Sequence, residues 1–94
     1  MIRTRKYGND IYEYIFPKKV TDDDYEFLLE KLEENFQSKN KFCLLLNLKE
    51  LEDVPFKMLK KLANYLNEKE LHVESYLDKT AIVLTKDFTR KLLQ

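Results

Sequence analysis

The chain has 94 residues, a length that supports one domain, residues 1–94, built around a single hydrophobic core. Hydrophobic residues make up 44% and charged residues 36%, which excludes a disordered chain and indicates a packed globule with solvated outer faces. Lysine plus arginine and aspartate plus glutamate are balanced at 17 each, so no overall field would hold the chain on a nucleic acid or an anionic membrane.

The sequence also indicates a cellular location. Residues 1–6 are charged and precede no apolar segment of signal-peptide length, and no window approaches a membrane span. Cys43 is the single cysteine and lies within an apolar run, so an intramolecular disulfide is excluded. We therefore expect an unprocessed cytoplasmic protein without a membrane span.

The first half of the chain predicts a β-hairpin followed by an amphipathic helix. Segments 2–7 and 11–16 flank Gly8–Asp10, a turn sequence typical of antiparallel hairpins. Thr21 and the aspartates after it predict a helix start, and the helix should run to about Ser38. Residues at helical spacing form its apolar face: Tyr25, Leu28, Leu29, Leu32 and Phe36.

The second half predicts two more strands separated by a helix. Residues 42–48 form an almost continuous apolar run, which indicates a strand with neighbours on both edges or cover on both faces. A second helix should span about 55–68, with Asp53 as its cap. Residues 71–77 are ambiguous between helix and strand, and residues 80–85 predict the last strand. The apolar stripe of the second helix is expected at Phe56, Leu59, Leu62, Ala63 and Leu66.

These elements follow the order β-β-α-β-α-β-α, with the final helix starting at Asp87. Strands joined through helices run parallel, whereas the hairpin strands run antiparallel. The sequence therefore predicts an α/β fold, bordering on α+β, with a mixed four-stranded sheet. The first helix is acidic and the second is basic, so adjacent helices would present stripes of opposite sign that either steer a partner or simply solvate the surface.

Segments 20–26, 44–48 and 79–84 resemble a STAS domain, the fold of anti-sigma-factor antagonists, and more closely a divergent branch of that superfamily. The resemblance covers about residues 11–94 and implies a regulatory, protein-binding role. Antagonists of this family carry a phosphorylatable serine after the central strand. The matching segment 51–56 holds no serine, threonine or glycine, so no phosphoswitch is implied. Family members also add a strand and a closing helix, so this chain is either a minimal version or leaves an edge for another chain to cover.

The reactive side chains do not indicate a catalytic site. Cys43 and His72 are the only thiol and imidazole of the chain, so a catalytic cysteine–histidine dyad is conceivable from composition alone. No third group orients the histidine, however, and a cysteine in the middle of a strand is usually a buried hydrophobic residue. One cysteine and one histidine offer no paired metal-ligand spacing. Asp22–Asp24 lacks the spaced ligands of a calcium loop and is better explained by helix capping. We expect no enzyme activity, no metal and no cofactor.

The loop after the central strand is the expected binding surface, because open α/β sheets bind ligands beyond the carboxyl ends of their strands. The expected binding residues are Lys49, Glu50, Glu52, Asp53 and Lys57. The leading hypothesis is a non-catalytic module that binds a protein partner, a second copy of the chain included. The alternative is a carrier of a small apolar or lipid-like ligand, with a pocket lined by Tyr12, Tyr14, Phe16, Tyr25 and Phe36.

Overall fold

Four strands and three helices make up the computed structural model, which describes residues 1–52 and 56–83. The elements are β1 (Arg3–Tyr7), β2 (Ile11–Ile15), α1 (Asp22–Gln37), β3 (Phe42–Asn47), α2 (Phe56–Glu68), α3 (Glu70–Tyr76) and β4 (Leu77–Val83). The strands form one sheet in the order β1-β2-β3-β4, with β1 antiparallel to β2 and the other pairs parallel. The predicted α/β class and mixed four-stranded sheet are confirmed.

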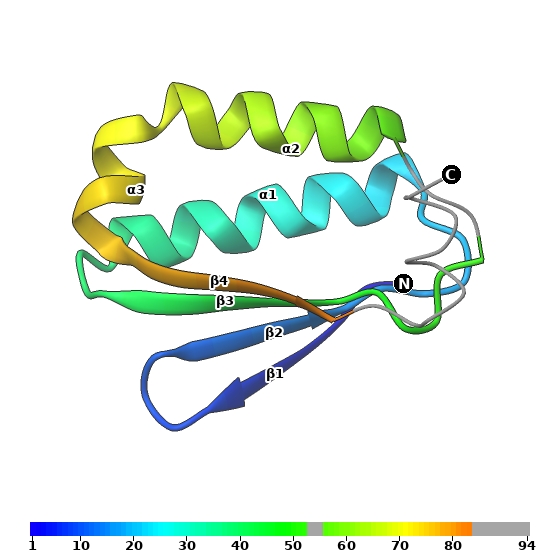
Figure 1. The fold of residues 1–94 in the computed structure, drawn as a ribbon, viewed down its shortest axis with the longest axis horizontal. Helices are drawn as coiled ribbons and strands as arrows, with labels where there is room; N and C mark the ends of the chain where they lie inside the picture. Colours follow the sequence, from blue (N-terminus) through cyan, green and yellow to red (C-terminus); the bar gives the residue numbers. More distant parts are fainter. Residues whose placement is uncertain (53–55, 84–94) are drawn as a thin grey trace.

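The helices all lie on one face of the sheet, with α1 and α2 side by side (Figure 1). The fold therefore has two layers, and within the described residues no helix covers the opposite sheet face. No helix in this described part of the chain is long and apolar enough to cross a membrane.

The segment before the last strand is where the structure adds detail to the prediction. The ambiguous residues 71–77 are almost entirely helical, as α3, and β4 begins at Leu77, three residues before the predicted start at residue 80. The strand is longer because Leu77 pairs with Phe42, and a register shift beyond that pair then places Lys79 opposite Cys43. The final helix predicted from Asp87 lies outside the described residues.

The hairpin between β1 and β2 depends on one glycine. Gly8 has φ +62°, in the left-handed region that side chains with a Cβ rarely adopt. All five residues of β1 are paired, from Arg3 opposite Ile15 to Tyr7 opposite Ile11. The turn therefore sets the register that places β1 at one edge of the sheet.

We expect Gly8→Ala to lower the free energy of unfolding by about 1 kcal/mol, because alanine is strained at positive φ. Gly8→Asn should cost less, since asparagine tolerates this region. Urea unfolding of both variants measures the difference. Equal losses for the two substitutions would show that backbone conformation is not the cause.

The core lies between the sheet and the helices. Its largest fully buried side chains come from two elements and the residue after a third: Phe16 after β2, Leu28 and Leu32 of α1, and Leu44 of β3. Along β3, Phe42, Leu44 and Leu46 are buried, whereas the alternate side chains are only partly covered. Of the two expected ways to accommodate the apolar run at 42–48, the structure therefore shows neighbouring strands on both edges.

Candidate interaction surface

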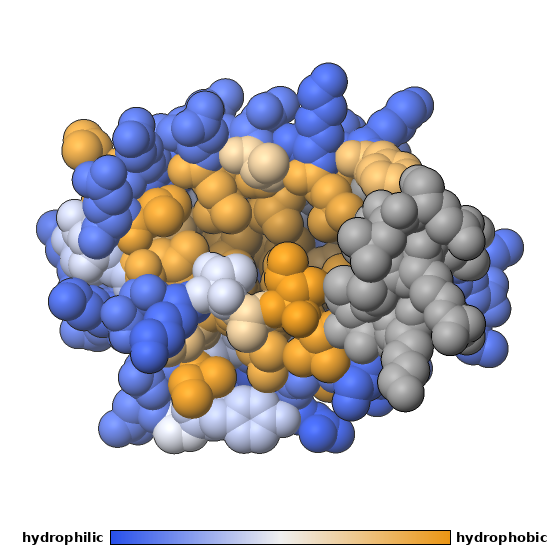
Figure 2. All heavy atoms as spheres, viewed as in Figure 1, coloured by the Kyte–Doolittle hydropathy of each residue, from blue (hydrophilic) through white to orange (hydrophobic). Residues whose placement is uncertain are grey.

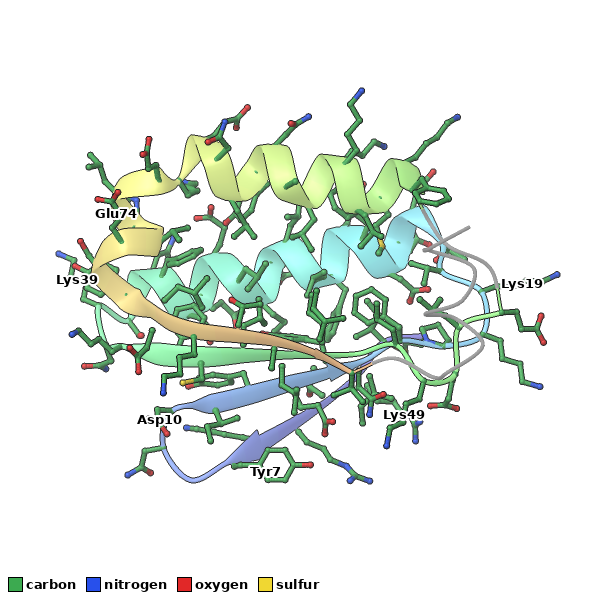
Figure 3. The ribbon with its side chains drawn as sticks, viewed as in Figure 1. Tyr7, Asp10, Lys19, Lys39, Lys49 and Glu74 are labelled. Carbon is green, nitrogen blue, oxygen red and sulfur yellow. The ribbon has the colours of Figure 1, made fainter. Side chains whose placement is uncertain are left out.

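The expected binding loop begins at the carboxyl end of the sheet, where the parallel strands β2, β3 and β4 all end. Its turn is held by the backbone N–H of Lys49, which donates to Asn47 Oδ1 at 3.1 Å. Lys49 and Glu50 are both exposed, and Glu50 forms an ion pair with Arg3 at 2.5 Å. Figure 3 shows Lys49 at the end of the molecule opposite the hairpin turn.

The structure separates the remaining expected residues. The backbone N–H of Glu52 donates to the Lys18 carbonyl at 3.2 Å, which ties the loop to the segment after β2. Lys57 lies instead in the helix layer, beside a shallow hollow of about 150 Å³ that Thr21 and Tyr25 also line. Asp53 lies outside the described residues. The four expected residues that the structure describes therefore span two layers rather than one compact site.

Cys43 and His72 lie on different layers. Cys43 alternates with the buried Phe42 and Leu44, so its side chain points toward the sheet face without helices. His72 is exposed on α3 and stacks near Phe36, with ring centroids 6.1 Å apart. The sheet lies between the two side chains, so the Cys43 thiol and the His72 imidazole are not in contact.

The aspartates at the start of α1 cap the helix. Thr21 Oγ1 accepts from the Asp24 N–H at 3.2 Å, and Asp24 Oδ2 accepts from the Thr21 N–H at 3.0 Å. Asp24 Oδ1 also accepts from the N–H of Ile2 at 3.1 Å, so the carboxylate joins the start of β1 to the helix. Burial alone would raise the pKa of Asp24, but the hydrogen bonds from Thr21 and Ile2 and the terminal ammonium outweigh it and hold the pKa below its ordinary value.

No group of three or more potential metal-ligating side chains occurs among residues 1–52 and 56–83. Of the acidic cluster at Asp22–Asp24, Asp24 belongs to the capping box, and Asp22 and Asp23 lie in the first turn, where carboxylates complement the helix dipole.

A buried carboxylate on the helix-free face of the sheet was missed by sequence reasoning. Glu13 is only 6% exposed, and it accepts hydrogen bonds from Tyr7 Oη at 2.8 Å and Asn47 Nδ2 at 3.2 Å. The signal was its place in the period-two pattern of β2, on the same face as Ile11 and Ile15. The contact joins three strands and holds this face of the sheet together.

The seam between α1 and α2 pairs the acidic helix with the basic one. Glu33 of α1 accepts a hydrogen bond from Tyr65 Oη and lies 3.0 Å from Lys69 Nζ. Burial and the neighbouring Glu33 carboxylate raise the pKa of Tyr65, so the hydroxyl stays protonated and donates. Lys61 Nζ lies 5.8 Å from the centre of the Tyr25 ring, further along the same seam.

This seam rotates α2 away from the predicted orientation. Its buried side chains are Met58 and Leu62, whereas Phe56 is 67% exposed and Ala63 is also exposed. The prediction that Phe56 and Ala63 face the core is therefore wrong. The apolar face of α2 is wider than the part of it that is buried. The hydrogen bond from Tyr65 to Glu33 holds one side of the helix against α1, and the opposite side is exposed.

We name the resulting exposed apolar area the β4–α2 surface. It comprises the exposed Phe56 and Ala63 of α2 and the exposed Ile82 of β4, with Leu59 and Leu66 of the same helix only partly buried against the core. Ile82 is 56% exposed and pairs with Leu46, on the helix side of the sheet. Figure 2 shows a broad apolar area between α2 and the edge of the sheet at β4.

The aromatic residues expected to line a lipid pocket do not share one cavity. Phe16 and Phe36 are buried within the core. Tyr12 and Tyr14 line an open groove beside β1, and Tyr25 lines the small hollow at the start of α2. The carrier hypothesis stays a prediction.

Searches with this chain gave no match to any family model, curated protein or solved structure. The resemblance to STAS domains therefore stays a prediction.

Proposed function

We propose that this chain is a non-catalytic protein-interaction module that pairs with a second copy of itself along β4. The observation that carries the proposal is the combination of an exposed edge strand with an apolar helix side above it. Five consecutive residues of β4, Asp78 to Ile82, are exposed. Among the described residues β4 pairs only with β3, so within this part of the chain its outer N–H and C=O groups face no other strand.

The charges of β4 are compatible with self-pairing. If two copies run antiparallel and are centred on Thr80, Lys79 of one copy lies opposite Ala81 of the other, and Asp78 lies opposite Ile82. No like charges then oppose each other, and the two Thr80 side chains meet at the axis, a favourable cross-strand pair. Such pairing would join two four-stranded sheets into one symmetric sheet.

The β4–α2 surface supports the same arrangement. Strand pairing of two copies would bring the exposed apolar sides of their α2 helices toward each other above the joined sheet. Burying Ile82 and Phe56 would add the apolar contact that an isolated strand pair lacks. The net charge of zero means that two copies do not repel each other overall.

The expected loop residues adjoin this edge. The backbone N–H of Leu48 donates to the Val83 carbonyl at 2.9 Å, so the loop begins beside the end of β4. We place Lys49, Glu50 and Glu52 at the rim of the proposed interface. Rim charges act mainly on the rate and specificity of association.

Light scattering and sedimentation at micromolar concentration test the proposal. We expect a dimer for the natural chain and a monomer for Ile82→Glu, which places a charge within the apolar contact. Thr80→Lys should also give a monomer, because two lysines would meet at the axis. Circular dichroism verifies that both variants remain folded.

Leu71→Glu is the matched control, since Leu71 is 77% exposed on α3, outside the β4–α2 surface. This variant should remain dimeric. A natural chain that is monomeric throughout the micromolar range would refute self-pairing, as would a dimer that survives both Ile82→Glu and Thr80→Lys.

A further inference from the structure

The opposite edge of the sheet has a different chemistry. β1 pairs only with β2 among the described residues, and all five of its side chains are exposed. Three of the five are arginine or lysine, so a second copy of β1 would bring cations together along the pair. A charged edge of this kind resists self-pairing, and a strand with acidic residues complements it best.

An open groove runs beside this edge. It has a volume of about 410 Å³ and lies between the helix-side face of the hairpin and α1. The hairpin contributes Thr4, Arg5, Lys6, Tyr12, Glu13 and Tyr14, and α1 contributes Lys31, Glu34 and Asn35. The register explains the hairpin wall, because Thr4 pairs with Tyr14 and Lys6 with Tyr12 on the same face of the sheet.

The groove combines aromatic walls with hydrogen-bond donors. Tyr14 Oη accepts from Asn35 Nδ2 at 3.0 Å, and burial raises the pKa of the Tyr14 hydroxyl to about 12, so the hydroxyl stays protonated. Lys6 Nζ lies 5.3 Å from the centre of the Tyr12 ring. Two carboxylates also border the groove, and both have partners: Glu34 lies 3.5 Å from Lys31 Nζ, and Glu13 accepts from Tyr7 and Asn47.

We propose that the free edge of β1 and this groove form a docking site for an extended acidic segment of a partner protein. The segment would pair with the main chain of β1, a recognition mode in which hydrogen bonds give affinity and alternate side chains give specificity. Carboxylates on one side of the segment would meet Arg5, and side chains on the other side would enter the groove beside Lys6. An aromatic side chain there would pack against Tyr12 and Tyr14.

This site does not depend on self-pairing along β4, because β1 and β4 are the two opposite edges of the sheet. One copy of the chain can use both edges at once. The experiments are therefore separable, since Ile82→Glu changes only the β4 edge and substitutions in β1 change only the docking site.

The probe is an acetylated, amidated octapeptide of alternating glutamate and valine, with one central valine replaced by tyrosine and a fluorophore at its end. Fluorescence anisotropy at low salt measures its binding. We expect the peptide in which lysine replaces glutamate to bind at least about tenfold more weakly. Of two peptides N-methylated at alternate residues, one should lose binding and the other should retain it, because only one set of N–H groups faces β1.

Lys6→Glu should weaken binding of the acidic peptide by about tenfold or more, whereas the matched control Lys60→Glu, on the exposed surface of α2, should leave it nearly unchanged. Equal losses for the two variants would mean general charge attraction and would overturn the proposal. So would binding that survives both N-methylation patterns, or amide chemical-shift changes confined to β4. A free glutamyl-tyrosine dipeptide that binds as tightly as the octapeptide would indicate a small-molecule site instead.

Discussion

Replacing Phe16 by alanine is expected to lower the free energy of unfolding by about 3–5 kcal/mol. Phe16 is completely buried, and its backbone N–H donates to the Asn47 carbonyl at 3.0 Å, so the ring enters the core where β2 leaves the sheet. Domains of this size have a total stability of roughly 5–15 kcal/mol, so the variant should lose about a fifth or more of it. Equilibrium unfolding in urea measures the change.

Phe56→Ala is the matched control, because the same atoms are removed from a side chain that is 67% exposed. Its effect on unfolding should be within about 0.5 kcal/mol. Both substitutions are best made in the Ile82→Glu background, so that the proposed dimer does not contribute to the measured stability. If Phe56→Ala were as destabilising as Phe16→Ala, the placement of α2 in the structure would be wrong.

The elements that the sequence predicted well are those set by local chemistry. Thr21 and Asp24 mark the start of α1, because they form a capping box within four residues of the sequence. Gly8 marks the hairpin because the turn needs a positive φ. The apolar run at 42–48 identifies the central strand, since a strand with neighbours on both sides exposes little of either face.

The orientation of α2 depends on contacts that are distant in sequence. Its apolar stripe is wide enough to fit two orientations, and the hydrogen bond from Tyr65 to Glu33, 32 residues away, belongs to only one of them. Hydrophobic periodicity alone therefore favoured Phe56 over Met58 as a core residue. The apolar side that remained exposed became the β4–α2 surface.

The two candidate surfaces also differ in how far the sequence predicts them. The loop at Lys49 and Glu50 was predictable, because it follows directly from the end of a strand. The groove beside β1 was not, since it combines Lys6 and Tyr12 with Asn35 of α1, and only the packing of helix on hairpin brings these residues together. The basic residues of β1 were visible in the sequence, but the groove next to them was not.

Asp24→Ala is expected to destabilise the fold by about 2–3 kcal/mol at neutral pH, because it removes a helix cap and charge-assisted hydrogen bonds together. The lost contacts are those from Thr21 and from the N–H of Ile2, which joins β1 to α1. Asp23→Ala is the control, since Asp23 is exposed in the same helical turn. Its loss should be only a few tenths of a kcal/mol, from the helix dipole.

The effect of Asp24 should also depend on pH in a defined direction. Its pKa in the folded protein lies below the ordinary value of 3.8, because the charged carboxylate receives hydrogen bonds that burial does not outweigh. A lowered folded pKa contributes stability that is complete above the unfolded pKa and is lost as the pH falls through the folded pKa. The difference in unfolding free energy between the natural chain and Asp24→Ala should therefore be constant above about pH 5 and shrink toward pH 3. Urea unfolding across this range provides the measurement, and a difference that stays constant down to pH 3 would show that the charge of Asp24 does not stabilise the joint between β1 and α1.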